Sequence, residues 1–226
     1  MNIVLMEPLS VPAQTLERFS APLKQAGHSI TAYDTFAVET EEMIARAKNA
    51  DELMIANHPL PDAVIEACPK LRYISVAFVG IDHVGQTACK ARDIHISNAA
   101  GYCRDAVAEL ALGLALDCLR NISACNNVVR KGGTKVGLVG HELSGRTVGI
   151  VGTGDTGIRT AQLYKAFGCR VLGYSRSQRQ LALDSGVEYV SLEQLLQMSD
   201  IVSVHTPLNE NTRNLINAER VAMMKP

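Results

Sequence analysis

The sequence predicts an α/β protein made of two Rossmann-like domains, each built on a parallel sheet. Short apolar runs alternate with helical patterns along the first half of the chain, and a second alternation begins near residue 146. A glycine triplet stands at the first turn of that second series. Such alternation is typical of parallel sheets, and 226 residues suffice for two modest domains. We place the boundary between residues 97 and 98.

The first predicted domain, residues 1–97, is expected to form a flavodoxin-like sheet without a glycine triplet of its own. Pro12 and Gly27 bound its first helix, since proline favours a helix start and glycine a helix end. The predicted strands cover residues 2–6, 28–32, 52–56, 71–77 and 94–97, and the predicted helices cover 11–26, 40–50, 62–68 and a stretch ending at 87–91.

A polar hinge at 98–101 leads into a long predicted helix over residues 103–121. The apolar stripe of this helix is wide, which predicts burial between two layers. Glu109 within it is expected to be a paired polar group at a domain junction; the alternative is a catalytic role. Residues 126–144 are polar and contain glycine, so they are predicted to form a loop or arm.

The second predicted domain, residues 98–226, contains the strongest motif in the chain. An apolar strand over residues 147–151 is followed at once by Gly152-x-Gly154-x-x-Gly157, a helix that Gly168 ends, and a strand over 170–174. The first glycine permits a sharp turn, the second a close approach of backbone to a pyrophosphate, and the third close packing of helix on strand. This context predicts a dinucleotide site; the alternative is a βα turn that is merely rich in glycine.

The rest of this domain continues the alternation. A helix is predicted over 180–185, a strand over 187–190, a helix begun by the capping box of Ser191 and Gln194, and a strand over 200–204. His205, Thr206 and Pro207 follow that strand, on the side where open α/β sheets bind ligands. A last helix, capped by Asn217, is expected to reach residue 224.

The residues after the second strand of this domain predict the choice of cofactor. An acidic residue about 20 positions past the fingerprint usually binds the ribose hydroxyls of NAD, but here the chain reads Ser175-Arg176-Ser177. An arginine can pair with the 2′-phosphate of NADP, and serine hydroxyls can donate to it. We therefore predict NADP in preference to NAD; the alternative is a solvent-facing arginine in a tolerant NAD site.

The turn after the fourth strand of the first domain, residues 78–83, is a second candidate site. It stands at the carboxyl end of a strand, where backbone N–H groups can hold a carboxylate. The alternative is a plain loop in which Asp82 caps the following helix.

Composition excludes several other classes of function. The chain is 47% hydrophobic with a formal net charge of -1, which indicates neither nucleic-acid binding nor attachment to a membrane. Its six cysteines form no CxxC pair and no zinc-site spacing with the histidines, so no metal site is expected. Unpaired cysteines favour a reducing, cytoplasmic compartment.

Four stretches together resemble the D-isomer-specific 2-hydroxyacid dehydrogenases: VAFVGIDHV (76–84), NAAGYCRDAVAELALGLALDCLRN (98–121), GHELSGRTVGIVGTGDTGIRTAQ (140–162) and DIVSVHTPLNENTRNLINAERVAMMKP (200–226). The resemblance implies two Rossmann-like domains with the active site in the cleft between them. It also implies transfer of hydride between a nicotinamide cofactor and a 2-oxo or 2-hydroxy acid such as glyoxylate or hydroxypyruvate.

The resemblance also implies roles for individual residues. Val79 and Gly80 would donate to the substrate carboxylate, and a homodimer would form through the helix and arm at 102–145. The implied cofactor-binding residues, with the fingerprint glycines, are Val107, Gly152, Gly154, Asp155, Thr156, Gly157, Ser175, Arg176, Ser177, His205, Thr206, Pro207 and Thr212.

Two departures from the family pattern qualify these expectations. Asp155 places a carboxylate beside the expected pyrophosphate. The family's catalytic arginine, glutamate and histidine lie beyond the segment that matches residues 223–226, so we expect no catalytic residue in this chain, a truncated second domain with an exposed strand edge, and poor hydride transfer. The alternative function is a catalytically silent nucleotide-binding protein with a sensing or interaction role.

Overall fold

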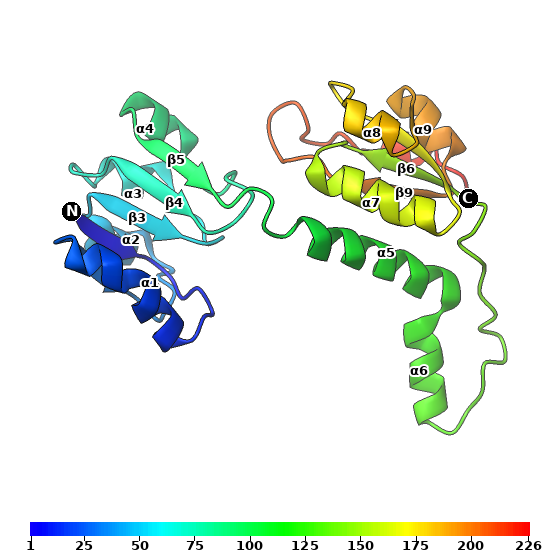
Figure 1. Ribbon diagram of the computed structural model, residues 1–226, viewed down its shortest axis with the longest axis horizontal. Coiled ribbons are helices and arrows are strands. Elements are labelled where there is room, and N and C mark those ends of the chain that lie inside the picture. The colour runs from blue at the N-terminus through cyan, green and yellow to red at the C-terminus, as the bar shows by residue number, and fades with distance from the viewer. The chain divides into compact units, whose positions relative to one another are not determined.

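The computed structural model describes all 226 residues, and the chain divides into two compact units, Met1–Tyr102 and Cys103–Pro226 (Figure 1). The division falls a few residues later than the sequence predicts. The Ala99 amide donates to the Phe78 carbonyl over 2.9 Å, and the Tyr102 ring packs on the Phe78 ring at 6.3 Å. Because of these contacts, the predicted hinge at residues 98–101 belongs to the first unit.

A five-stranded, wholly parallel sheet forms the centre of the first unit, in the order β2-β1-β3-β4-β5. This order is that of flavodoxin-like sheets, with a topological switch point between β1 and β3. The strands are β1 (Asn2–Leu5), β2 (Ser29–Ala32), β3 (Glu52–Ile55), β4 (Tyr73–Val76) and β5 (His95–Asn98).

Short helices connect these strands and bury an aliphatic core that includes Leu53, Val64 and Ile74. Asp82 does not cap a helix: α4 begins after Gly85, and the Asp62 carboxylate accepts from its Ala88 amide over 2.8 Å. The alternative reading of the 78–83 turn is therefore wrong in that detail. The helices are α1 (Ala13–Gln25), α2 (Thr40–Ala47), α3 (Asp62–Glu66) and α4 (Gln86–Ala91).

The second unit contains a four-stranded parallel sheet in the order β8-β7-β6-β9. Counted within the unit the order is 3-2-1-4, the beginning of the doubly wound Rossmann order, so the predicted fold class is confirmed. Its switch point lies between β6 and β9. The strands are β6 (Thr147–Val151), β7 (Arg170–Tyr174), β8 (Val187–Tyr189) and β9 (Ile201–Val204).

Helices cover both faces of this sheet, because successive side chains of each central strand point to opposite faces. Val148 and Ile150 of β6 pack in the cluster that α7 completes, whereas Val151 packs with the leucines of α9. The capping box of Ser191 and Gln194 begins α9, as the sequence predicts. These helices are α7 (Asp155–Ala166), α8 (Gln180–Asp184), α9 (Leu192–Met198) and the short α10 (Ala218–Val221).

The long helix α5 (Arg104–Arg120) packs on α7, but the predicted burial on both sides is wrong. Leu112 is buried against the core, whereas Leu110 and Leu114 are 61% and 57% exposed. The apolar stripe is wider than the surface that α7 offers, so part of it faces solvent. Glu109, predicted to be paired, forms no ion pair.

A second correction concerns residues 126–130, which belong to the helix α6 (Ile122–Arg130) and not to a loop. Asn121 adopts a left-handed conformation, with φ of 53°, that ends α5. The Asp117 carboxylate then accepts from the amide and hydroxyl of Ser123, which stabilises the first turn of α6.

All six cysteines are free thiols in this structure. None of the helices has the length and apolar character that crossing a membrane requires.

Candidate functional site

A cavity of about 510 Å³ opens at the carboxyl ends of β6, β7 and β9 in the second unit. This position is the switch point of the sheet, where doubly wound folds bind their ligands. Nine of the residues singled out in the sequence line it: Gly152, Gly154, Ser175, Arg176, Ser177, His205, Thr206, Pro207 and Thr212.

The three fingerprint glycines have three different surroundings. Gly152 has a φ of +98°, and a Cβ there would lie 2.7 Å from the His205 carbonyl oxygen. A Cβ on Gly157 would lie 2.0 Å from the Gly152 carbonyl oxygen. A Cβ on Gly154 would meet nothing within 4 Å, so this glycine leaves open space beside the cavity that it lines. The first and third glycines are thus required by the fold, and the second keeps room for a ligand.

Helix α7 begins directly after Gly154. The amides of Asp155, Thr156 and Gly157 donate no hydrogen bond within the chain, as expected for the first turn of a helix. Free amides and the positive end of the helix dipole favour an anion at this place. These three residues stand beside the cavity and do not line it.

The loop after β7 is fixed to the fingerprint turn by the Tyr189 side chain. The Tyr189 hydroxyl lies 2.6 Å from the hydroxyl of Thr153, which is buried, and accepts from the Arg179 amide over 3.1 Å. The Arg179 guanidinium in turn lies 2.7 Å from the Asp155 carboxylate. The Asp155 carboxylate, which departs from the family pattern, therefore has a basic partner that balances its charge.

His205 occupies the far side of the cavity, next to the end of β9. Its amide donates to the Val151 carbonyl over 2.7 Å, and its Nε2 lies 2.9 Å from the Ser203 hydroxyl. Burial lowers the pKa of the imidazole, because desolvation penalises its charged form. Burial therefore disfavours the charged form of His205, and no carboxylate contacts its ring.

Thr212 closes the turn that follows Pro207. Its hydroxyl donates to the Pro207 carbonyl over 2.5 Å and accepts from the Asn209 amide over 2.9 Å. These bonds hold the wall of the cavity that follows β9.

Sequence reasoning missed four lining residues, Tyr174, Asn209, Asn211 and Leu215. Asn209 accepts from the Asn211 amide through its side chain, a turn that the Asn-x-Asn spacing could have indicated. Val107, the remaining predicted cofactor contact, lies on α5 with 39% exposure and outside this cavity.

The predicted carboxylate-binding turn lies in the first unit, after β4. Neither the Val79 nor the Gly80 amide donates to any group of the chain. The Asn98 side chain donates to the Val79 carbonyl over 2.7 Å, which orients the peptide that joins these two residues. The turn thus presents two free N–H groups, the arrangement that a carboxylate needs.

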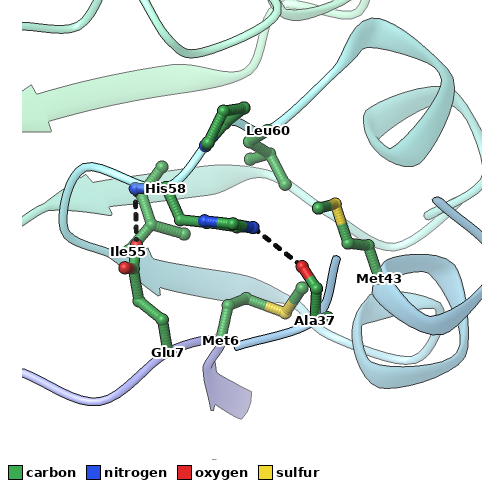
Figure 2. Close-up of a pocket in the computed structure, with 8 residues that line it drawn as sticks. Met6, Glu7, Ala37, Met43, Ile55, His58 and Leu60 are labelled. Atoms are coloured by element: carbon green, nitrogen blue, oxygen red, sulfur yellow. Dashed lines mark hydrogen bonds between the residues drawn. The ribbon is translucent and has the colours of Figure 1, made fainter. Parts of the chain in front are cut away.

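A buried carboxylate, Glu7, holds the segment that follows β3 (Figure 2). Glu7 is 2% exposed, and its Oε1 accepts from the amides of Ala56 and His58 over 2.7 and 3.1 Å. The His58 ring donates to the Ala37 carbonyl over 2.8 Å. Outside that view, the His83 ring donates to the Ala56 carbonyl over 3.0 Å. Glu7 therefore fixes the segment after β3, and that segment fixes the end of the Val79–Gly80 turn.

The structure contains no cluster of three or more histidine, cysteine, aspartate or glutamate side chains that could hold a metal ion. The groups that the cavity and the turn offer to a ligand are backbone amides, hydroxyls, side-chain amides, the His205 imidazole and the exposed guanidinium of Arg176.

The fold and the cavity define a doubly wound α/β protein with a glycine-rich switch point. Residues 112–226 match the family described as "D-isomer specific 2-hydroxyacid dehydrogenase, NAD binding domain". The chain belongs to the D-isomer-specific 2-hydroxyacid dehydrogenase family, as the sequence resemblance predicts.

Individual relatives agree with this assignment. The chain is 36% identical over 190 residues to a glyoxylate reductase of Korarchaeum cryptofilum, covering 81% of this chain and 57% of that protein. It is 35% identical to a hydroxypyruvate reductase of Thermotoga maritima, covering 83% and 61%. The chain thus spans about three fifths of the length of these relatives.

Among solved structures, the chain is similar to the D-lactate dehydrogenase of Aquifex aeolicus complexed with NAD and lactic acid. The two superpose with a TM-score of 0.86 at 28% identity, over 100% of this chain and 66% of that one.

Proposed function

We propose that the second unit binds a nicotinamide dinucleotide in the cavity at the switch point. The observation that carries this proposal is the conjunction of an open Gly154 with the unpartnered amides of α7. A pyrophosphate needs both, because it requires close approach of backbone and several N–H donors.

The cofactor would lie across the carboxyl edge of the sheet. The amides of Asp155, Thr156 and Gly157 would hold its pyrophosphate, and the loop after β7 its adenosine ribose. The nicotinamide end would lie toward Val107, His205, Thr206, Pro207 and Thr212.

The loop after β7 favours NADP. Ser175, Arg176 and Ser177 line the cavity, and no carboxylate does. A carboxylate would repel the 2′-phosphate, whereas a guanidinium and two hydroxyls can pair with it. Arg176 is exposed and engages no acidic partner, so it is available to the phosphate.

We further propose that the first unit holds the substrate, a small 2-oxo or 2-hydroxy acid such as glyoxylate or hydroxypyruvate. The free amides of Val79 and Gly80 would bind its carboxylate. A bound nicotinamide supplies the hydride that reduces such an acid. In this proposal the residues of the chain orient the acid and the cofactor. We propose no residue of the chain as the group that transfers the proton.

A second candidate is nucleotide binding without turnover. His205, the one histidine that lines the cavity, faces the Ser203 hydroxyl, and burial lowers the pKa of its imidazole. A histidine without a carboxylate partner is a poor acid–base catalyst for the hydroxyl proton.

One experiment separates the two candidates. The chain is titrated with NADPH and then mixed with glyoxylate or hydroxypyruvate while the nicotinamide absorbance is followed. Binding with turnover supports the reductase, and binding without turnover supports the silent nucleotide-binding protein. Absence of binding overturns both.

We also propose that a second copy of the chain covers the exposed apolar side chains of α5 and α6. Leu110, Leu114, Ile122 and Val129 are all at least half exposed and carry no polar atoms. Sedimentation of the chain and of Leu114→Glu tests this: the chain should sediment as a dimer and the variant as a monomer. A monomeric wild-type chain would contradict the proposal.

A further inference from the structure

Asp155 and Arg179 form an ion pair at the edge of the candidate cofactor cavity. Arg179 Nη1 lies 2.7 Å from Asp155 Oδ1, and the two side chains are 43% and 63% exposed. Asp155 directly follows Gly154, which lines the cavity, and Arg179 stands two residues after Ser177, which also lines it. The pair thus joins the start of α7 to the segment that follows β7.

The two parts of Arg179 differ in how firmly they are held. Its amide donates to the Tyr189 hydroxyl, which contacts the buried Thr153, so the backbone is fixed to the fingerprint. Its guanidinium is held only by the exposed Asp155 carboxylate. An exposed pair of this kind contributes little to stability, so the guanidinium can exchange partners at little cost.

We propose that Asp155 and Arg179 act as a partner-exchange pair that determines how strongly the chain selects NADP over NAD. Arg179 pairs with Asp155 in the free chain and with the 2′-phosphate when NADP is bound. The 2′-phosphate is the stronger partner, since it carries nearly two negative charges, whereas the Asp155 carboxylate carries one and engages only Nη1 of Arg179. Asp155 competes for that guanidinium and therefore weakens the selection. This inference rests on the proposed cofactor binding.

The ratio of the two affinities isolates this effect. Removal of the Asp155 charge relieves repulsion of the pyrophosphate, which NADPH and NADH share equally. The same removal frees Arg179, which only NADPH can use. A change in the NADPH-to-NADH affinity ratio therefore reports on Arg179 and not on the pyrophosphate.

The experiment measures both affinities by fluorescence titration for the chain, Asp155→Asn, Arg179→Gln and the double variant. Asp155→Asn should raise the ratio about threefold, and Arg179→Gln should lower it about tenfold. In the Arg179→Gln background, Asp155→Asn should leave the ratio unchanged. Glu188→Gln is the matched control, because it removes the same charge from a similarly exposed pair with Arg170 at the opposite end of β7. It should not alter the ratio.

The outcomes also separate this inference from the proposal on which it rests. Binding of both cofactors with a ratio that Asp155→Asn does not change overturns the inference alone. An equal rise of the ratio in the presence and absence of Arg179 also overturns it, because the effect would then not pass through the guanidinium. A chain that binds neither cofactor overturns the proposed cofactor site and this inference together.

Discussion

The α-carbon of Gly157 faces the carbonyl oxygen of Gly152 so closely that a Cβ on Gly157 would lie 2.0 Å from that oxygen. This contact brings the first turn of α7 against the end of β6. Gly157 is therefore a glycine that the fold requires. Gly154 differs from it, because a Cβ on Gly154 would meet nothing within 4 Å, and we expect a ligand to need that space.

Two alanine substitutions test that difference. Gly157→Ala should lower the melting temperature of the second unit by several degrees, because backbone and not a flexible side chain blocks the added methyl group. Gly154→Ala should leave the melting temperature nearly unchanged and weaken binding of NADPH, because its methyl group enters the space expected for the pyrophosphate. Calorimetry and fluorescence titration measure the two effects. Equal melting temperatures for both variants would contradict the account.

A second prediction concerns the loop after β7. Ser175→Asp should shift the cofactor preference from NADPH toward NADH, because a carboxylate accepts from ribose hydroxyls and repels a 2′-phosphate. The affinity ratio should change by about tenfold or more, as expected for a charged hydrogen-bond partner. Ser185→Asp in the same unit, near the end of α8 and outside the cavity, is the control. A Ser175→Asp variant that still binds NADPH more tightly would show that the 2′-phosphate lies elsewhere.

The elements that local patterns determine were predicted well from the sequence. The strand, glycine turn and helix of the fingerprint follow one another within 20 residues, and the capping box of Ser191 and Gln194 is wholly local. Helix α6 was missed because Asn126 and Asn127 interrupt the apolar residues of its sequence, ISACNNVVR. The contact between Asp117 and Ser123 that stabilises its first turn also joins two different helices.

Features that depend on distant partners could not be predicted. The exposure of Leu114 depends on how much of the surface of α5 is covered by α7. The pairing of Asp155 with Arg179 joins residues 24 positions apart, and the role of Glu7 depends on amides about 50 positions away. Most of the candidate cofactor cavity was nevertheless predicted, because the carboxyl ends of parallel strands meet at one edge of the sheet.

A third prediction concerns the buried Glu7. Glu7→Ala leaves the amides of Ala56 and His58 without an acceptor, at a cost of about 1–3 kcal/mol for each buried donor. Glu7→Gln retains an acceptor oxygen and should cost less. Hydrogen exchange followed by mass spectrometry should show faster exchange at residues 55–60 for Glu7→Ala than for Glu7→Gln. Equal exchange in the wild-type chain and Glu7→Ala would show that this carboxylate does not stabilise the segment.

A fourth prediction concerns pH. Burial lowers the pKa of His205 in the folded chain, whereas the unfolded chain takes up a proton near the ordinary value of about 6.5. Between those two values the unfolded state binds more protons, so stability is complete above about pH 6.5 and falls as the pH is lowered through it.

The melting temperature of the second unit should therefore drop between about pH 7.5 and about pH 5.5. His205→Asn keeps a side chain that can bond to the Ser203 hydroxyl but does not titrate, so its drop over the same interval should be smaller. A drop of the same size in the variant would assign the pH dependence to other groups.

The most direct test of the central claim, that the switch-point cavity of the second unit is a site for NADP, is calorimetric titration of the chain with NADPH and with NADH under identical conditions. The account predicts that both cofactors bind, NADPH more tightly, and that Arg176→Gln reduces the difference. Tighter binding of NADH, or binding of neither cofactor, would contradict it.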